Sequence, residues 1–126
     1  MNKSFSNLVI LIPAFNPNQN ILDLVMGLSK FNWKEIIIVN DGSVKESHSF
    51  FDNLNKIENV HIINHQINQG KGAALKTGID YVNNTFTNID GLITVDSDGQ
   101  HLVEDIVKIG LEVKNRKNDI IFGVRS

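Results

Sequence analysis

Two acidic side chains, Asp96 and Asp98, stand one residue apart directly after a run of β-branched residues in ITVDSDGQH, residues 93–101. Carboxylates with this spacing on a tight loop can direct oxygen atoms toward one divalent cation, and Gln100 can add an amide oxygen. Asp and Gly are also common where a strand ends in a turn. Taken alone, this stretch therefore fits a metal site and an ordinary turn equally well.

A second stretch, NQGKGAALKTG at residues 68–78, has the composition of a phosphate-binding loop at a helix start. A Walker loop requires Ser or Thr after its lysine, but Lys71 is followed by Gly72. A dinucleotide fingerprint would have Gly or Ala where Leu75 stands, and it would follow the first strand. The stretch predicts instead a glycine turn leading into a helix, with Lys71 free to meet an anion or solvent.

A third stretch, VNDGS at residues 39–43, ends another β-rich run. By itself it is typical of a simple strand-ending turn. As a functional residue, Asp41 can accept hydrogen bonds from a nucleobase or a ribose, as acidic groups do after early strands of nucleotide-binding sheets. Both interpretations stay open on these five letters.

The histidines show no pairing that indicates a zinc site. We predict that His48, His61 and His65 are surface or packing residues. His101 differs only because it adjoins the acidic loop.

The elements that must position these residues follow from an alternation of short β-rich runs with segments of helical periodicity. This alternation predicts an α/β domain in which helices cover a parallel sheet. The predicted strands are LVILI (8–12), EIIIV (35–39), VHII (60–63), GLITV (91–95) and DIIFG (119–123). Most are apolar without alternation, as strands buried on both faces are. Since ligands of such sheets bind beyond the carboxyl ends of the strands, the polar residues there are predicted to share one edge.

Helical periodicity predicts the covering helices. One apolar face consists of Ile21, Leu22, Val25 and Leu28, and another of Val103, Ile106, Val107, Gly110 and Leu111. The segment after Gly72 is predicted as a helix whose small residues allow close approach to a strand, and its members are Ala73, Ala74, Thr77, Gly78 and Tyr81. A weaker pattern predicts a further helix within residues 44–54.

Composition limits the function classes. A chain of 126 residues with a net charge of −2 and a pI near 6.0 fits one domain, and its dispersed charges argue against nucleic-acid binding or a polybasic membrane patch. The absence of cysteine excludes disulfides and thiolate metal sites and suits a reducing compartment, so we expect a cytoplasmic protein. The apolar run at 8–12 is interrupted by Pro13 and is too short for a signal peptide or a membrane span.

Four stretches together, VILIPAFN, IIIVNDGS, NQGKGAALKTG and ITVDSDGQH, occur in the order and spacing of the family 2 glycosyltransferases. The chain resembles that family over nearly its whole length. The resemblance implies a GT-A (Rossmann-like) nucleotide-sugar-binding domain, with a mainly parallel sheet of about five strands flanked by helices. The GKGAALKTG and DSDGQH versions look most like the dolichyl- and polyprenyl-phosphate sugar transferase branch.

The resemblance also implies roles for individual residues. Asp41 would hold the base of the nucleotide-sugar donor. The residues implied to line the nucleotide pocket or border the nucleoside are Pro13, Ala14, Asn16, Gly70 and Lys71. These assignments come from the matching motifs and not from spacing.

The acidic stretch receives its role in the same way. Asp96 would face the ribose or a metal, Asp98 would bind the metal and act in catalysis through it, and Gln100 would complete the coordination. Arg125, the arginine of the family's GSR stretch, would meet a phosphate, although this chain has GVR there. Val103 stands where relatives often have Pro.

The implied reaction is transfer of a hexose, with inversion, from a UDP- or GDP-hexose to an acceptor, for which a polyprenyl phosphate is one candidate. Mg²⁺ or Mn²⁺ would stabilise the leaving diphosphate. A hydroxyl acceptor would need a general base, whereas an ionised phosphate acceptor would not. Asp119 cannot be that base because it begins a strand at the opposite end of the sheet.

The family's usual base lies beyond residue 126. We therefore expect the chain to be a single donor-binding domain, residues 1–126, cut before an acceptor-binding half and by itself able to bind donor without transferring sugar. The full-length protein would be cytoplasmic, with peripheral attachment to the inner face of the membrane as one possibility. Neither the sugar nor the oligomeric state follows from the sequence.

Alternatives make different use of the acids. In haloacid dehalogenase-type phosphotransferases Asp96 would be the nucleophile, but that motif opens the domain and normally continues with Thr or Val where Gln100 stands. A receiver-like signalling domain would place an acid pair after the first strand, where this chain has PAFN. An EF-hand would require a helix before Asp96, where a strand is predicted.

Overall fold

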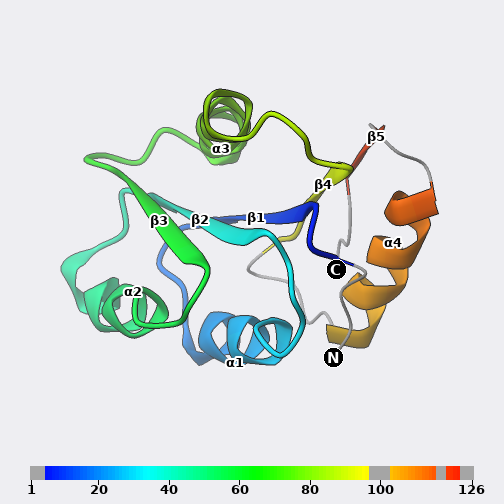
Figure 1. The fold of residues 1–126 in the computed structure, drawn as a ribbon. Helices are drawn as coiled ribbons and strands as arrows, with labels where there is room; N and C mark the ends of the chain where they lie inside the picture. Colours follow the sequence, from blue (N-terminus) through cyan, green and yellow to red (C-terminus); the bar gives the residue numbers. More distant parts are fainter. Residues whose placement is uncertain (1–4, 97–102, 116–118, 123–126) are drawn as a thin grey trace.

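The computed structural model describes residues 5–96, 103–115 and 119–122. Its strands form one five-stranded sheet in the order β3-β2-β1-β4-β5, and every neighbouring pair is parallel (Figure 1). The strands are β1 (Leu8–Ala14), β2 (Glu35–Asp41), β3 (Val60–His65), β4 (Gly91–Thr94) and β5 (Asp119–Phe122). The predicted α/β class and the five predicted strands are confirmed.

Three strands continue beyond their apolar runs at the carboxyl end, which the sequence did not predict. Ala14 of β1 pairs with Asn40 of β2, and Asp41 of β2 pairs with His65 of β3. A parallel ladder is made by main-chain groups, so it continues through polar residues as long as the two strands stay side by side. The polar residues at this edge are therefore held by the sheet.

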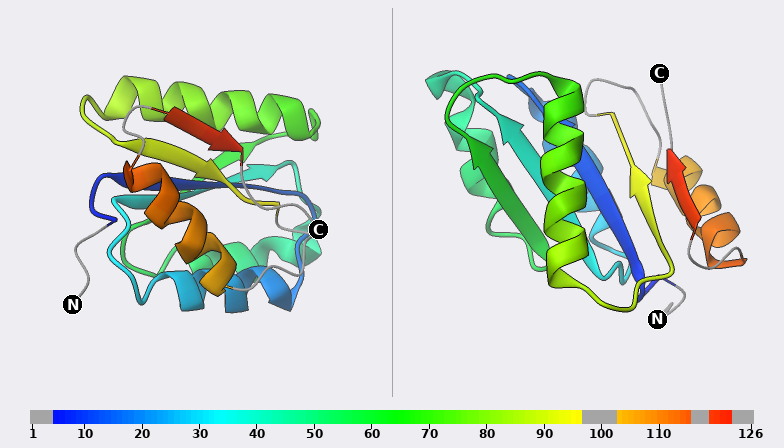
Figure 2. Two further views of the ribbon diagram at one scale, coloured as in Figure 1. Left: turned by 90° about the vertical axis from the view of Figure 1, so that its right-hand side faces the viewer. Right: turned by 90° about the horizontal axis from the view of Figure 1, so that it is seen from above.

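Helices cover both faces of the sheet. Helix α3 (Lys71–Thr85) lies alone on one face, while α1 (Gln19–Leu28), α2 (His48–Leu54) and α4 (Val103–Asn115) lie on the other (Figures 1 and 2). The weakly predicted helix is α2, preceded by a 3₁₀ turn at Lys45–Ser47. Among the described residues, no helix has the length and apolar character that crossing a bilayer requires.

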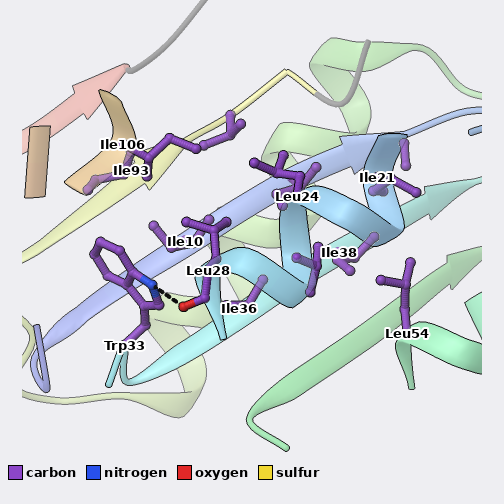
Figure 3. Close-up of a cluster of buried hydrophobic side chains, with 14 of the residues drawn as sticks. Ile10, Ile21, Leu24, Leu28, Trp33, Ile36, Ile38, Leu54, Ile93 and Ile106 are labelled. Carbon is purple, nitrogen blue, oxygen red and sulfur yellow. Dashed lines mark hydrogen bonds between the residues drawn. The ribbon is translucent and has the colours of Figure 1, made fainter. Parts of the chain in front are cut away.

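Alternate residues of the central strands enter two separate apolar clusters, as the two-residue period of a strand requires. Ile10 of β1 packs on the side of α1, α2 and α4, whereas Leu11 packs on the side of α3. Figure 3 shows the larger cluster, in which the Trp33 indole N–H donates a hydrogen bond of 3.0 Å to the carbonyl oxygen of Leu28 at the end of α1. The same carbonyl, in the last turn of the helix, also accepts a hydrogen bond of 3.0 Å from the main-chain N–H of Phe31.

The predicted helical faces are confirmed except at one position. Gly78 of α3 lies so close to Leu11 that a Cβ atom there would collide with the leucine side chain, so the predicted close approach is present. Leu111 of α4 is 44% exposed, contrary to prediction. The buried line of this helix runs through Ile106, Gly110 and Val113, and Leu111 lies about 100° around the helix from Gly110.

Candidate functional site

A pocket of about 220 Å³ opens at the carboxyl ends of β1, β2 and β4. It brings together six residues that the sequence implicated, namely Pro13, Ala14, Asp41, Gly70, Lys71 and Asp96. Phe15, Asn68 and Ala74 complete its lining, and sequence reasoning missed all three. The predicted gathering of polar residues at one edge of the sheet is therefore present.

Asn16, predicted to line the pocket, instead joins two loops beside it. Its main-chain N–H donates a hydrogen bond of 2.9 Å to the Ser43 hydroxyl, and its side-chain oxygen accepts one of 2.8 Å from the main-chain N–H of Val44. Asn16 has φ of 49°, a left-handed conformation that asparagine tolerates better than most residues. The residue thus ties the loop that carries Phe15 to the turn after β2.

Asp41 is buried, and both of its carboxylate oxygens are occupied by hydrogen bonds. Oδ1 lies 2.8 Å from Nδ1 of His65 and accepts a bond of 2.9 Å from the Gln69 main-chain N–H. Oδ2 accepts bonds of 2.9 Å from the Gly70 N–H and 3.1 Å from the Asn68 amide. Burial alone would raise the pKa of Asp41, but the bonds from His65, Gln69 and Gly70 together lower it below its ordinary value.

The loop of residues 66–70 lies directly over the turn that follows β2. Gly42 has φ of +70°, and a Cβ atom at this position would collide with the main chain of Ile67 and Asn68. Gly70 has φ of 98° and ψ of 160°, a conformation available almost only to glycine, and it is the N-cap residue directly before α3. The two glycine-containing motifs, NDGS and NQGKG, therefore form one packed unit.

His65 belongs to this unit, so its prediction as a surface or packing residue was wrong in part. Its side chain is 8% exposed, and its second ring nitrogen, Nε2, lies 2.8 Å from the Thr77 hydroxyl on α3. By contrast, His61 stacks on Tyr81 with ring centroids 4.6 Å apart, which confirms a packing role for it, and His48 is exposed. No local pattern in the sequence indicated this pairing, because His65 lies opposite Asp41 only through the register of β2 and β3.

Lys71 and Asp96, which both line the pocket, form an ion pair. Lys71 Nζ donates to Asp96 Oδ2 at 3.1 Å, and the two side chains are 56% and 25% exposed. The pair joins the first turn of α3 to the residues after β4. It places a cation and an accessible carboxylate on the same wall of the pocket.

The described residues contain no group of three or more acidic or histidine side chains arranged to hold a metal ion. Asp98, Gln100 and Arg125, three of the predicted site residues, lie outside the described residues. Of the predicted metal ligands, the structure therefore describes Asp96, whose carboxylate is chemically suited to a hard divalent cation.

A larger and more open pocket, of about 530 Å³, lies between the ends of β2 and β3 and helix α2. Its lining is mostly amide and histidine side chains, and although Asn40 and Ser43 of the IIIVNDGS stretch line it, it contains none of the predicted site residues. We assign the functional site to the smaller pocket because the charged residues of three motifs meet there, and size alone does not identify a binding site.

Comparison with known sequences points to one family. The family model described as Glycosyl transferase family 2 matches residues 9–126. A UDP-N-acetylglucosamine–dolichyl-phosphate N-acetylglucosaminyltransferase of Methanococcus voltae is 30% identical over 92% of this chain and 51% of that protein. The dolichyl-phosphate β-glucosyltransferase ALG5A of Trichomonas vaginalis is 29% identical over 86% of this chain and 35% of that protein.

Comparison with solved structures shows the fold. The crystal structure of S. aureus TarS, residues 1–349, matches with a TM-score of 0.65 at 17% identity over 86% of this chain and 32% of that chain. The same protein in complex with UDP-GlcNAc matches with a TM-score of 0.59 at 19% identity over 86% of this chain and 31% of that chain. This chain spans about half the length of three curated relatives, between 45% and 52%, and between 25% and 35% of three others.

Proposed function

The chain belongs to glycosyl transferase family 2, and on that premise we propose that its pocket binds a nucleoside-diphosphate sugar for transfer of a hexose. The observation that carries the proposal is the meeting of six motif residues in one pocket at the carboxyl edge of a parallel sheet. We further propose that residues 1–126 act as one donor-binding domain whose acceptor is bound by other parts of the protein. The matches support neither the phosphotransferase nor the receiver-like alternative.

The pocket offers suitable chemistry for the nucleoside. Phe15 is 45% exposed at its rim, so its ring can stack on a base. We propose that Asp41 holds the base, as its motif implies. Since both of its oxygens already accept hydrogen bonds, a donor on the base would replace the longest of them, the 3.1 Å bond from Asn68.

The part of the pocket lined by Lys71 and Asp96 suits the diphosphate. Lys71 carries a positive charge into the pocket, and the neighbouring Asp96 would share a cation or face the ribose. We propose that Asp98 and Gln100 complete a site for Mg²⁺ or Mn²⁺ with Asp96, and that Arg125 meets a phosphate. A divalent cation bound there would stabilise the negative charge that develops on the leaving nucleotide.

The names of the relatives support a lipid phosphate as the acceptor. Two of them are named as transferases that act on dolichyl phosphate, and the TarS complex contains UDP-GlcNAc. An ionised phosphate oxygen can attack the anomeric carbon from the face opposite the nucleotide and invert that carbon without a general base. We therefore propose a UDP- or GDP-hexose as donor, a lipid phosphate as acceptor, and a cytoplasmic protein that works at the inner membrane face.

Calorimetric titration tests the proposal. UDP-GlcNAc, UDP-glucose and GDP-mannose are added to the protein with and without Mn²⁺, and at least one should give saturable, metal-dependent heat. Asp98→Ala should abolish the metal dependence. Asp80→Ala is the matched control, because Asp80 is an exposed acid paired with Lys76 on the outside of α3 and should leave binding unchanged. No metal-dependent heat with any of the three sugars would overturn the proposal.

A further inference from the structure

A buried hydrogen-bonded chain links α3 to the ends of β2 and β3 through His65. The Thr77 hydroxyl lies 2.8 Å from one ring nitrogen of this histidine, and the Asp41 carboxylate lies 2.8 Å from the other. The His65 and Asp41 side chains are 8% and 4% exposed. Such a chain is expensive to bury unless each member is paired, so its completeness indicates a defined role.

The chemistry of the partners determines the direction of these bonds. An ionised carboxylate only accepts, so Nδ1 of His65 carries the proton and donates to Asp41. In the neutral ring, Nε2 then accepts from the Thr77 hydroxyl, and in the protonated ring it donates to the same oxygen. Both contacts of His65 can be made in either protonation state of the ring. We refer to the three residues Thr77, His65 and Asp41 as the clamp.

The clamp acts on the 66–70 loop. Once the Asp41 carboxylate is held by His65, its oxygens can accept the main-chain N–H groups of Gln69 and Gly70, both at 2.9 Å. Gly70 leads directly into Lys71, whose ammonium group lies 3.1 Å from Asp96. His65 is thus connected to Lys71, which lines the donor pocket, through Asp41 and Gly70.

We propose that His65 is a positioning residue for donor binding: it orients Asp41, which holds the 66–70 loop and so places Lys71 at the pocket. His65 is not among the residues that line the donor pocket, so it acts through Asp41 and not by touching the donor. The effect on donor binding rests on the proposed function, whereas the effect on the loop does not.

The chain offers a matched control for this proposal. His61 lies on the same strand as His65, packs against the same helix α3, and stacks on Tyr81. Replacing either histidine by alanine removes a ring from between β3 and α3. Only His65→Ala removes a partner of Asp41, so a general loosening of this interface should affect both variants alike.

Two measurements test the proposal. In ligand-free protein, amide hydrogen exchange of Gln69 and Gly70 should be about tenfold faster in His65→Ala than in wild type, because the loop opens more often. The dissociation constant for UDP-GlcNAc with Mn²⁺ should rise by about tenfold, the effect of losing roughly one charge-assisted hydrogen bond. His65→Asn, whose amide N–H can still donate to Asp41, should recover most of both effects, and His61→Ala should show neither.

Unchanged exchange at Gln69 and Gly70 in folded His65→Ala would overturn the proposal, and so would equal effects in His61→Ala. Thr77→Val, which removes the hydroxyl but keeps the volume, provides the same comparison if His65→Ala does not fold; faster exchange supports the clamp and wild-type exchange contradicts it. If wild type binds none of the three sugars, the proposed function fails, while amide exchange still decides whether His65 holds the loop.

Discussion

Two aspartates in the same pocket, Asp41 at the end of β2 and Asp96 after β4, have opposite surroundings. The Asp41 side chain is 4% exposed and accepts hydrogen bonds on both oxygens, whereas the Asp96 side chain is 25% exposed and pairs with a lysine that is itself largely exposed. A buried carboxylate with such partners organises the main chain, while an accessible one can exchange its partner for a ligand. The same residue type at neighbouring strand ends is thus held by main-chain donors in one place and partly accessible to water in the other.

The largest expected effect on stability comes from removing the side chain of Asp41, the buried aspartate. Asp41→Ala leaves His65 and two main-chain N–H groups without their acceptor, and we expect the free energy of unfolding to fall by about 3–5 kcal/mol. Urea denaturation monitored by circular dichroism measures this loss. A decrease below about 1 kcal/mol, the range of exposed pairs, would remove the proposed distinction between the two aspartates.

A smaller loss is expected where the loop held by Asp41 requires glycine. Gly70→Ala forces a side chain into a conformation with φ of 98° and should lower the free energy of unfolding by about 1–3 kcal/mol. Gly72→Ala is the control, because Gly72 lies inside α3 with open space around it and should gain up to about 1 kcal/mol from helix propensity. Equal effects of the two substitutions would show that the strained conformation at Gly70 is unimportant.

Acidification should remove part of the free energy of unfolding that Asp41 contributes. The pKa of Asp41 is lowered from its ordinary value of 3.8, so its stabilisation is fully present above that pH and is lost as the pH falls through the lowered pKa. The stability difference between wild type and Asp41→Asn should therefore be constant near neutral pH and shrink below about pH 4. Urea denaturation of both proteins between pH 7 and pH 2.5 provides the measurement. A stability difference that grows on acidification would contradict the prediction that the ionised form of Asp41 stabilises the fold.

The smallest change in stability is expected at the exposed member. Asp96→Ala breaks an ion pair with Lys71 whose partners are both accessible to water, and the free energy of unfolding should change by less than about 1 kcal/mol. Binding of the nucleotide sugar should nevertheless be lost, as calorimetry with Mn²⁺ would show. Asp80→Ala should match its small effect on stability and keep full binding. If Asp96→Ala unfolded the protein as readily as Asp41→Ala, the contrast between the two sites would not hold.

Much of the fold could be predicted because the core strands are buried on both faces and are nearly continuous apolar runs, as in LVILI and EIIIV. The strand ends could not be predicted in the same way. Asn40, Asp41 and His65 lie inside the sheet because main-chain pairing with a neighbouring strand continues past the apolar residues. Which residue lies opposite which is a property of the register, and register depends on strands far apart in the sequence.

The candidate site likewise contains some residues that the sequence could predict and others that it could not. Motif order and strand ends were enough to predict which residues would meet at one edge, and the pocket contains six of them. The roles of His65, Thr77 and Asn16 escaped prediction because each depends on a partner 12 to 28 positions away whose distance in space no local pattern encodes. Asp98, Gln100 and Arg125 lie outside the described residues, so their predicted roles stay predictions.

By itself, the sequence determined the family, the parallel α/β class and the edge of the sheet where chemistry belongs, because local hydrophobic periodicity and short motifs carry that information. Only the tertiary structure decided that Asp41 holds the 66–70 loop, whereas Asp96 forms a partly exposed ion pair with Lys71. The physical reason is that a carboxylate's behaviour depends on how many donors and how much water surround it, and those surroundings exist only after distant strands and loops have packed together.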